Sequence, residues 1–334
     1  MRGFIATLLA LLPGCATRDC TPPEVSAVED TRAFSAGLAT VAGAMEEVHV
    51  LVLSGGGSHG AWGAGVLNGW AQRPVFNVVT GVSTGALLAT HAFLGEPEVL
   101  RDLYTNVSDR DIYRQRFILA ALFSDSLASL APLERLIARH VTDETIDRVA
   151  AQGRRKLYVA TVDLDHGETR IWDLTAEARA KRYDRYRSIL LASSSVPGLY
   201  PPVMIDGSMH VDGGVREQLF VRRVMLELCR KQKRVTVHVL VNGKLGVGGA
   251  CVQPRLLDVA LRGVAVLASA SAQGNLLQSR VTALENGAAW RMSRIPEEIG
   301  LDFDSQHFPT EGMRRLFYEG VRLADQWEEE LPRW

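Results

Sequence analysis

Residues 49–60 have the sequence HVLVLSGGGSHG, in which a short apolar run passes directly into a glycine-rich turn. The run 49–53 is rich in β-branched residues, which is typical of a strand buried inside a parallel sheet. A helix is expected to follow at 61–71, where small residues permit close packing. This order of strand, turn and helix predicts an α/β fold.

A second strand is expected at 75–80, followed by the turn GVSTG at 81–85 and another helix at 86–94. A serine flanked by glycines on a strand-to-helix turn is held in a strained backbone conformation, with its hydroxyl pointing outward. The N-terminus of the following helix also favours developing negative charge. Ser83 is therefore a candidate nucleophile.

The turn after the first strand contains Gly55, Gly56 and Gly57. Three successive glycines expose unhindered backbone N–H groups, which an oxyanion hole needs. Both turns belong to neighbouring strands of one βαβ unit, so the topology brings them together. A Gly-x-Ser-x-Gly pattern alone is weak evidence, but together with a glycine turn one crossover upstream it indicates acyl transfer.

The same glycines also satisfy the dinucleotide-binding pattern Gly55-x-Gly57-x-x-Gly60. That function requires an acidic residue about 20 residues further on, at the end of the second strand, to bind the ribose. The second strand ends in Thr80 and contains no acid. A nucleotide-dependent oxidoreductase is therefore disfavoured, and no cofactor is expected.

Two residues compete as the base that activates the serine. The α/β-hydrolase order places a histidine last, after several strands before the nucleophile; only one strand precedes Ser83 here, and nothing around His307 supports that role. Asp212 follows a short strand directly and precedes two glycines, so it is free to face a neighbouring strand end. Taken alone, this pattern is more typical of an ordinary Asp-Gly hairpin turn.

The three glycine motifs, in their order and spacing, resemble those of a patatin-like phospholipase domain over residues 46–245. Residues 157–164 and 192–202 are also similar to stretches of that family. The motifs are Gly55-Gly56-Gly57-x-x-Gly60, Gly81-x-Ser83-x-Gly85 and Asp212-Gly213-Gly214.

The resemblance implies a three-layer α/β/α sandwich with a mostly parallel central sheet. It also implies a catalytic dyad without histidine, in which Ser83 is the nucleophile, Asp212 the general base and Gly55, Gly56 and Gly57 the oxyanion hole. We expect the carboxylate to reach the hydroxyl across adjacent strand ends. Where this family usually has Arg or Lys, the sequence has His59, which could assist the oxyanion fully only below its reference pKa of about 6.5.

The function that follows is a serine acyl-ester hydrolase acting on lipids, of the phospholipase A or lysophospholipase kind. Membrane lipids or acyl esters would be its substrates, and the resemblance implies neither a cofactor nor a metal. Two alternatives stay open. One is a generic carboxylesterase or thioesterase of the same fold, and the other is a catalytically inactive module that binds lipids or a partner.

Composition limits the other function classes. The 334 residues are 47% hydrophobic and 22% charged, which is ordinary for a globular protein and excludes a disordered or multi-span membrane chain. With 37 basic and 38 acidic residues the net charge is −1, so no global field recruits nucleic acid. The expected division is a catalytic domain at 46–245 and a helical C-terminal extension of the same domain at 246–334, with a helix at 256–284, a strand near 290–292 and a helix at 312–330.

The N-terminus has the layout of a targeting segment. The apolar run 4–12 is too short to span a bilayer and follows a basic start, as in a signal peptide. Leu12-Pro13-Gly14-Cys15 resembles a bacterial lipobox, so we expect a signal peptide at 1–14, lipidation of Cys15 and a tether at 15–45. This predicts a lipid anchor in the bacterial cell envelope, at the outer membrane and facing the periplasm. A plain secretory signal is the alternative.

Three further patterns stay open. A disulfide between Cys229 and Cys251 is compatible with an oxidising compartment. Residues 163–166 (DLDH) have metal-ligating side chains, but they follow a strand and favour a turn over a metal site. The amphipathic stretch 101–152 predicts either a lid or acyl pocket, or helices that simply pack on the sheet.

Overall fold

The computed structural model describes residues 41, 46–115, 125–226, 234–247 and 251–332. The predicted signal peptide, Cys15, nearly all of the tether and Cys229 lie outside the described residues, so their predicted roles stay predictions.

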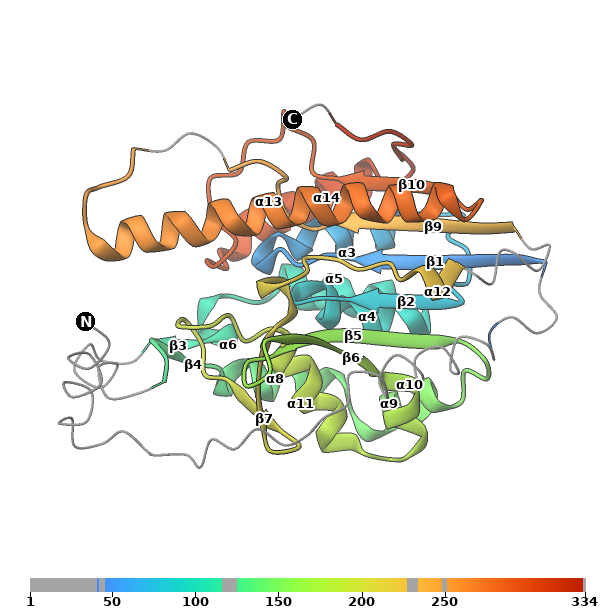
Figure 1. The fold of residues 1–334 in the computed structure, drawn as a ribbon, viewed down its shortest axis with the longest axis horizontal. Helices are drawn as coiled ribbons and strands as arrows, with labels where there is room; N and C mark the ends of the chain where they lie inside the picture. The colour runs from blue at the N-terminus through green and yellow to red at the C-terminus, as the bar shows by residue number, and fades with distance from the viewer. Residues whose placement is uncertain (1–40, 42–45, 116–124, 227–233, 248–250, 333–334) are drawn as a thin grey trace.

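One eight-stranded sheet forms the centre of the molecule, and its order confirms the mostly parallel arrangement (Figure 1). The strands follow one another as β10-β9-β1-β2-β5-β8-β7, and β6 pairs with β5 outside this path. The parallel strands are β1 (Glu47–Leu53), β2 (Val78–Gly81), β5 (Lys156–Asp163), β9 (Arg234–Val241) and β10 (Ala289–Arg294). The antiparallel strands are β6 (Glu168–Asp173), β7 (Val203–Ile205) and β8 (Ser208–Asp212).

Helices cover both faces of the sheet, which gives the predicted three-layer α/β/α sandwich. One face carries α12 (Arg223–Leu226) and α13 (Leu256–Glu285). The opposite face carries α3 (Gly60–Gly69), α4 (Thr84–Leu94), α5 (Pro97–Thr105), α8 (Ala131–His140), α9 (Asp143–Ala150), α10 (Leu174–Arg179), α11 (Tyr183–Ser193) and α14 (Thr310–Arg322). The sequence after α5 forms the short helix α6 (Asp109–Ile112) and then two short paired strands, β3 (Arg114–Gln115) and β4 (Ala128–Ser129).

The position of β1 at the centre of the sheet explains why its residues 50–53 are apolar without a break. Side chains alternate between the two faces of a strand. Leu51 and Leu53 belong to the core under α3 and α4, whereas Val50 and Val52 belong to the core under α13. Because both faces are covered there, the buried positions from Val50 to Leu53 are all apolar, whereas Glu47 at the start of the strand is exposed.

The C-terminal segments are built into the same sheet and core. β10 pairs with β9, and α14 packs against α3 where a Cβ on Gly65 or Gly320 would overlap backbone of the other helix. α13 is a single helix that continues through Gly274, whereas α14 ends at Arg322, earlier than its predicted end. Among the described residues, no helix has both the length and the apolar character needed to cross a bilayer.

Candidate active site

The turn at Ser83 has the strained geometry that its sequence predicts. Ser83 lies between β2 and α4 with φ 54°, a left-handed conformation that costs a non-glycine residue about 1–3 kcal/mol. A Cβ on Gly85 would overlap the carbonyl of Leu53, so only glycine lets this turn approach the end of β1. The side chain of Ser83 faces a pocket and is half-buried.

A second serine holds this turn in place. The N–H of Ser83 donates to Ser193 Oγ at 3.0 Å, and the Ser193 hydroxyl donates to the carbonyl of Ala160 at 2.8 Å. Ser193 ends α11 and Ala160 belongs to β5, so the nucleophile turn is fastened to its neighbouring strand. Sequence analysis placed Ser193 in a similar stretch but gave it no role.

Asp212 reaches Ser83 by a different path from the expected one. The prediction of adjacent strand ends is wrong, because β5 lies between β2 and β8. β8 runs antiparallel to β5, with Asp212 opposite Thr161. A Cβ on Gly213 would lie 2.6 Å from the carbonyl of Ala160, so glycine here allows the chain after Asp212 to lie directly against β5 and Val82. The Asp212 side chain is thereby hydrogen-bonded to Ser83.

The environment of Asp212 changes its acidity. The residue is only 4% exposed, and its Oδ1 accepts the N–H of Gly214 at 2.7 Å. Burial raises the pKa of Asp212 to about 6, although the hydrogen bonds from Ser83 and Gly214 oppose the shift. Such a carboxylate is a stronger base than an exposed aspartate and is still ionised at neutral pH.

The glycine turn after β1 offers two N–H groups. The N–H of Gly55 donates to the carbonyl of Gln218 at 2.8 Å, so it is already used. Within the described part of the chain, the N–H groups of Gly56 and Gly57 have no acceptor, and Gly57 lines the same pocket as Ser83. Of the three glycines predicted to form the oxyanion hole, Gly56 and Gly57 therefore keep an N–H group available in the described structure. Gly60 starts α3 where a Cβ would overlap Thr84 Oγ1.

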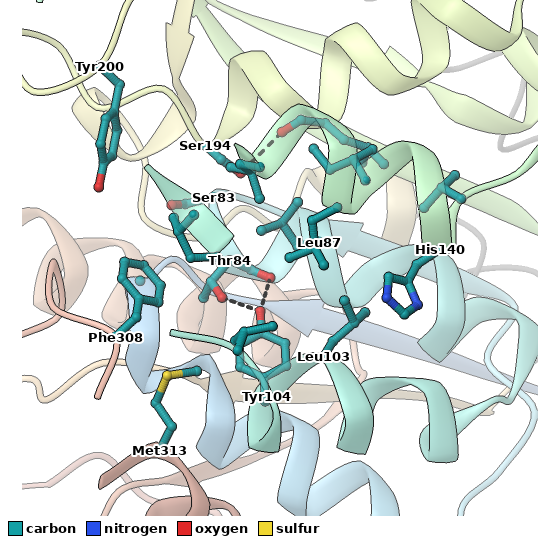
Figure 2. A pocket seen from close by; sticks show the side chains of 18 of the residues that line it. Ser83, Thr84, Leu87, Leu103, Tyr104, His140, Ser194, Tyr200, Phe308 and Met313 are labelled. Atoms are coloured by element: carbon teal, nitrogen blue, oxygen red, sulfur yellow. Dashed lines mark hydrogen bonds between the residues drawn. The ribbon is translucent and has the colours of Figure 1, made fainter. Parts of the chain in front are cut away.

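An apolar pocket, partly open to solvent, begins at Ser83 (Figure 2). Its walls include side chains from the 101–152 stretch, and Figure 2 shows Leu87 and Leu103 between Ser83 and His140. The helices of this stretch pack in the core on the sheet, as one of the two predictions has it, and side chains of the same stretch also line the pocket. Phe308 and Met313 complete the wall from the C-terminal segment.

A family model described as patatin-like phospholipase matches residues 51–225, which include all three glycine motifs. The chain belongs to the patatin-like phospholipase family. Among solved structures, it is similar to VipD from Legionella pneumophila, at 12% identity and a TM-score of 0.40, with 85% of this chain and 68% of that chain covered. No curated protein matches the sequence of this patatin-like chain.

His59, the departure from the usual family motif, is not poised as a cation. It is 8% exposed, and its Nε2 lies 3.3 Å from the carbonyl of Phe303. Burial lowers the pKa of His59 in spite of that carbonyl and Asp304, so the ring is neutral at pH 7. Because its pKa is lowered, His59 could assist an oxyanion as a cation only at a lower pH than its reference pKa indicates.

Other sequence candidates lie outside this site. His307 is exposed and pairs with Asp304 at 2.8 Å. Residues 164–167 form the expected turn, in which Asp163 accepts the N–H of Asp165 and contacts His166 Nδ1 at 2.8 Å. Cys251 is exposed and forms no disulfide within the described residues, which do not include Cys229.

Proposed function

We propose that this protein is a phospholipase A or lysophospholipase that cleaves acyl esters through a Ser83–Asp212 dyad. Membership of the patatin-like phospholipase family supports lipid acyl hydrolysis in general. The observation that carries the finer proposal is a buried carboxylate of raised pKa, hydrogen-bonded to a strained serine that faces an apolar pocket.

In the first half-reaction, Asp212 accepts the proton of Ser83 Oγ as that oxygen attacks the ester carbonyl carbon. The N–H groups of Gly56 and Gly57 donate to the resulting oxyanion, and the dipole of α4 adds to its stabilisation. Collapse of the intermediate breaks the ester bond, and Asp212 returns the proton to the leaving alcohol. The product is an acyl-enzyme on Ser83.

In the second half-reaction, Asp212 takes a proton from water, which attacks the acyl-enzyme. The bond to Ser83 Oγ breaks, the proton returns to Ser83, and a carboxylic acid leaves. A base works best when its pKa lies near the working pH, so a value of about 6 suits this role better than the value of about 4 for an exposed aspartate.

Product analysis on a substrate panel tests this proposal. The panel contains diacyl phospholipids, lysophospholipids, acyl thioesters and short-chain esters, each incubated with native protein and with Ser83→Ala. Release of fatty acid from phospholipids by the native protein alone supports it. Turnover of short esters or thioesters only would favour the generic esterase or thioesterase, and no turnover of any substrate would favour the inactive binding module.

The pH dependence of hydrolysis should report Asp212. We expect kcat/KM to rise with pH through a midpoint of about 6 and to level off above it, because only the ionised carboxylate accepts a proton. The measurement is kcat/KM for an uncharged short-chain ester between pH 4 and pH 9. A profile that is already level at pH 5 would show that a different group controls the reaction.

Removing the hydroxyl of Ser193 should impair catalysis without removing any reacting group. In Ser193→Ala the N–H of Ser83 loses its acceptor, so the turn is held less accurately, and kcat should fall by about tenfold or more with little change in KM. The matched control is Ser195→Ala, because Ser195 follows the end of α11 and, among the described residues, its hydroxyl donates only to the carbonyl of Leu191. Equal kcat values for the two variants would contradict the positioning role.

A further inference from the structure

The oxyanion donors and the base of the proposed reaction belong to strands that are not neighbours. The turn with Gly56 and Gly57 follows β1, whereas Asp212 ends β8, and β2 and β5 lie between these two strands. Backbone hydrogen bonds of a sheet join only adjacent strands. A misplacement of about 1 Å can lower the rate of an enzyme about 100-fold. Another contact is therefore needed to hold the two turns at a fixed distance.

Gln218 contacts both of these turns. Its carbonyl accepts the N–H of Gly55, which opens the oxyanion turn, at 2.8 Å. Its side-chain Nε2 donates to the carbonyl of Gly214 at 3.0 Å, and the N–H of Gly214 donates to Asp212 Oδ1 at 2.7 Å. One residue of the loop after Asp212 thus joins the turn after β1 to the turn that holds the base.

The side-chain amide of Gln218 occupies space that the two glycines leave free. A Cβ on Gly55 would lie 2.5 Å from Gln218 Oε1 and 3.4 Å from Ser83 Cβ. A Cβ on Gly214 would lie 2.7 Å from Gln218 Nε2 and 3.0 Å from Asp212 Oδ1. The amide therefore lies between the two turns and close to both members of the dyad, and a side chain on either glycine would displace it.

The backbone of Gln218 is held from the other side by α13. Its N–H donates to Asn275 Oδ1 at 2.8 Å. One turn earlier in α13, Ser271 Oγ lies 3.3 Å from both Asn275 Oδ1 and the carbonyl of Arg216. Both backbone groups of Gln218 are thus hydrogen-bonded, so its side chain starts from a fixed position.

We propose that Gln218 is a positioning residue, which sets the distance between the oxyanion donors and Asp212 by joining the Gly55 turn to the Gly214 turn. It takes no part in the proton transfer and acts through these two turns. This role rests on the proposed function, because it requires Gly56 and Gly57 to bind an oxyanion. Since that charge develops only in the transition state, loss of Gln218 should lower kcat and leave KM nearly unchanged.

Gln218→Met tests this role, because methionine has a similar length but cannot donate to Gly214. For a short-chain ester, kcat should fall by about tenfold or more and KM should stay within about twofold. The rate at which a fluorophosphonate labels Ser83 should fall by a similar factor, because that reaction uses the same base and oxyanion donors. Thermal unfolding checks the fold of the variant.

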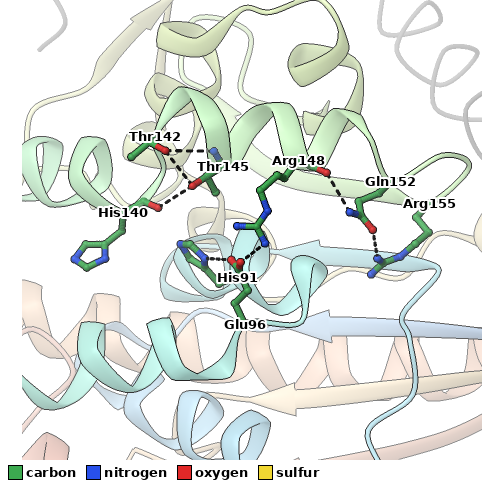
Figure 3. A network of polar contacts seen from close by, with 8 residues as sticks. All are labelled: His91, Glu96, His140, Thr142, Thr145, Arg148, Gln152 and Arg155. Atoms are coloured by element: carbon green, nitrogen blue, oxygen red, sulfur yellow. Dashed lines mark hydrogen bonds and ion pairs between the residues drawn. The ribbon is translucent and has the colours of Figure 1, made fainter.

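Gln152 offers a matched control on the pocket side of the molecule. Like Gln218 it is half-buried, and its Nε2 donates to the backbone carbonyl four residues earlier, that of Arg148, at 3.1 Å (Figure 3). It contacts neither catalytic turn in the described structure. Gln152→Met should therefore keep the native kcat, KM and labelling rate.

Gln218→Glu gives a readout that a purely structural role would not move. A carboxylate at this place puts a second negative charge beside Asp212 and raises the pKa of Asp212 above its native value of about 6. The midpoint of kcat/KM against pH should move upward by at least about half a pH unit. The same change at Gln152 should leave the midpoint where it is.

A native kcat and labelling rate in Gln218→Met, an equal loss in Gln152→Met, or an unmoved midpoint in Gln218→Glu would overturn the positioning role. If Gln218→Met does not fold, the pH profile of Gln218→Glu decides. A native protein that hydrolyses no ester would contradict the proposed function. The labelling rates of Ser83 would then still decide the role of Gln218, since labelling needs no ester substrate.

Discussion

Ser83→Ala is expected to lower kcat for ester hydrolysis by at least about 10⁴-fold, as removal of a nucleophile does in serine hydrolases. The serine hydroxyls nearest to this turn in the described structure are already used: Ser193 Oγ bonds between Ser83 and Ala160, and Ser194 Oγ donates to the carbonyl of Leu190. Steady-state hydrolysis of a short-chain ester gives the rate, and circular dichroism with thermal unfolding checks the fold.

The fold should survive this change, because alanine keeps the Cβ of Ser83 and loses only the hydroxyl. At φ 54°, alanine has a backbone strain similar to that of serine. A Ser83→Ala protein that unfolds like the native one and retains its hydrolysis rate would contradict the nucleophile assignment. Ser195→Ala, which removes a hydroxyl that donates to the carbonyl of Leu191 in α11, serves as the control for a generic serine substitution.

Asp212→Asn is expected to lower kcat by about 10³-fold or more, because an amide keeps the shape of the carboxylate but cannot accept the proton of Ser83. The same variant should be more stable than the native protein at neutral pH. The free energy of unfolding is the second measurement, taken by denaturant titration at pH 8 and at the lowest pH at which both proteins are folded.

The sign follows from the pKa of Asp212. In the folded protein this carboxyl holds its proton up to about pH 6, whereas the unfolded chain releases it near 4. The folded state binds more protons between these values, so native stability declines as the pH rises from about 4 to 6 and the loss persists above it. At pH 8 the asparagine variant should therefore gain up to about 3 kcal/mol. A variant that is less stable at both pH values by the same amount would contradict the buried, ionised Asp212.

The nucleophile turn could be predicted from sequence because its determinants are local. The glycines around Ser83 and the apolar strand before it lie within a few residues of one another, and the backbone conformation follows from them. The mostly parallel sheet was expected from the family resemblance that these local motifs carry. The end of α14 was not, since helix ends depend on packing as well as on local sequence.

The partner of Ser83 was predicted in identity but not in position. Nothing in residues 208–212 indicates that they pair antiparallel with β5, and this pairing places β5 between β2 and β8, the strands that lead to Ser83 and Asp212. Likewise, the sequence showed three glycines after β1, but not that Gln218 already accepts the N–H of Gly55. These are long-range contacts, which the local pattern does not contain.

The pocket residues illustrate the same limit. The four-residue spacing of Ser83, Leu87 and His91 is visible in the sequence. The packing of the 101–152 stretch against that face of α4 is not, and this packing forms the wall of the pocket. For such residues, the spacing indicates that they share one helix face, and only the fold shows what that face contacts.

The most direct test of the dyad is covalent labelling with a fluorophosphonate, followed by mass spectrometry of the peptides. We predict a single stoichiometric adduct on Ser83 in the native protein and a labelling rate at least about 100-fold lower in Asp212→Asn. A label on another serine, or undiminished labelling of Ser83 in the asparagine variant, would contradict it.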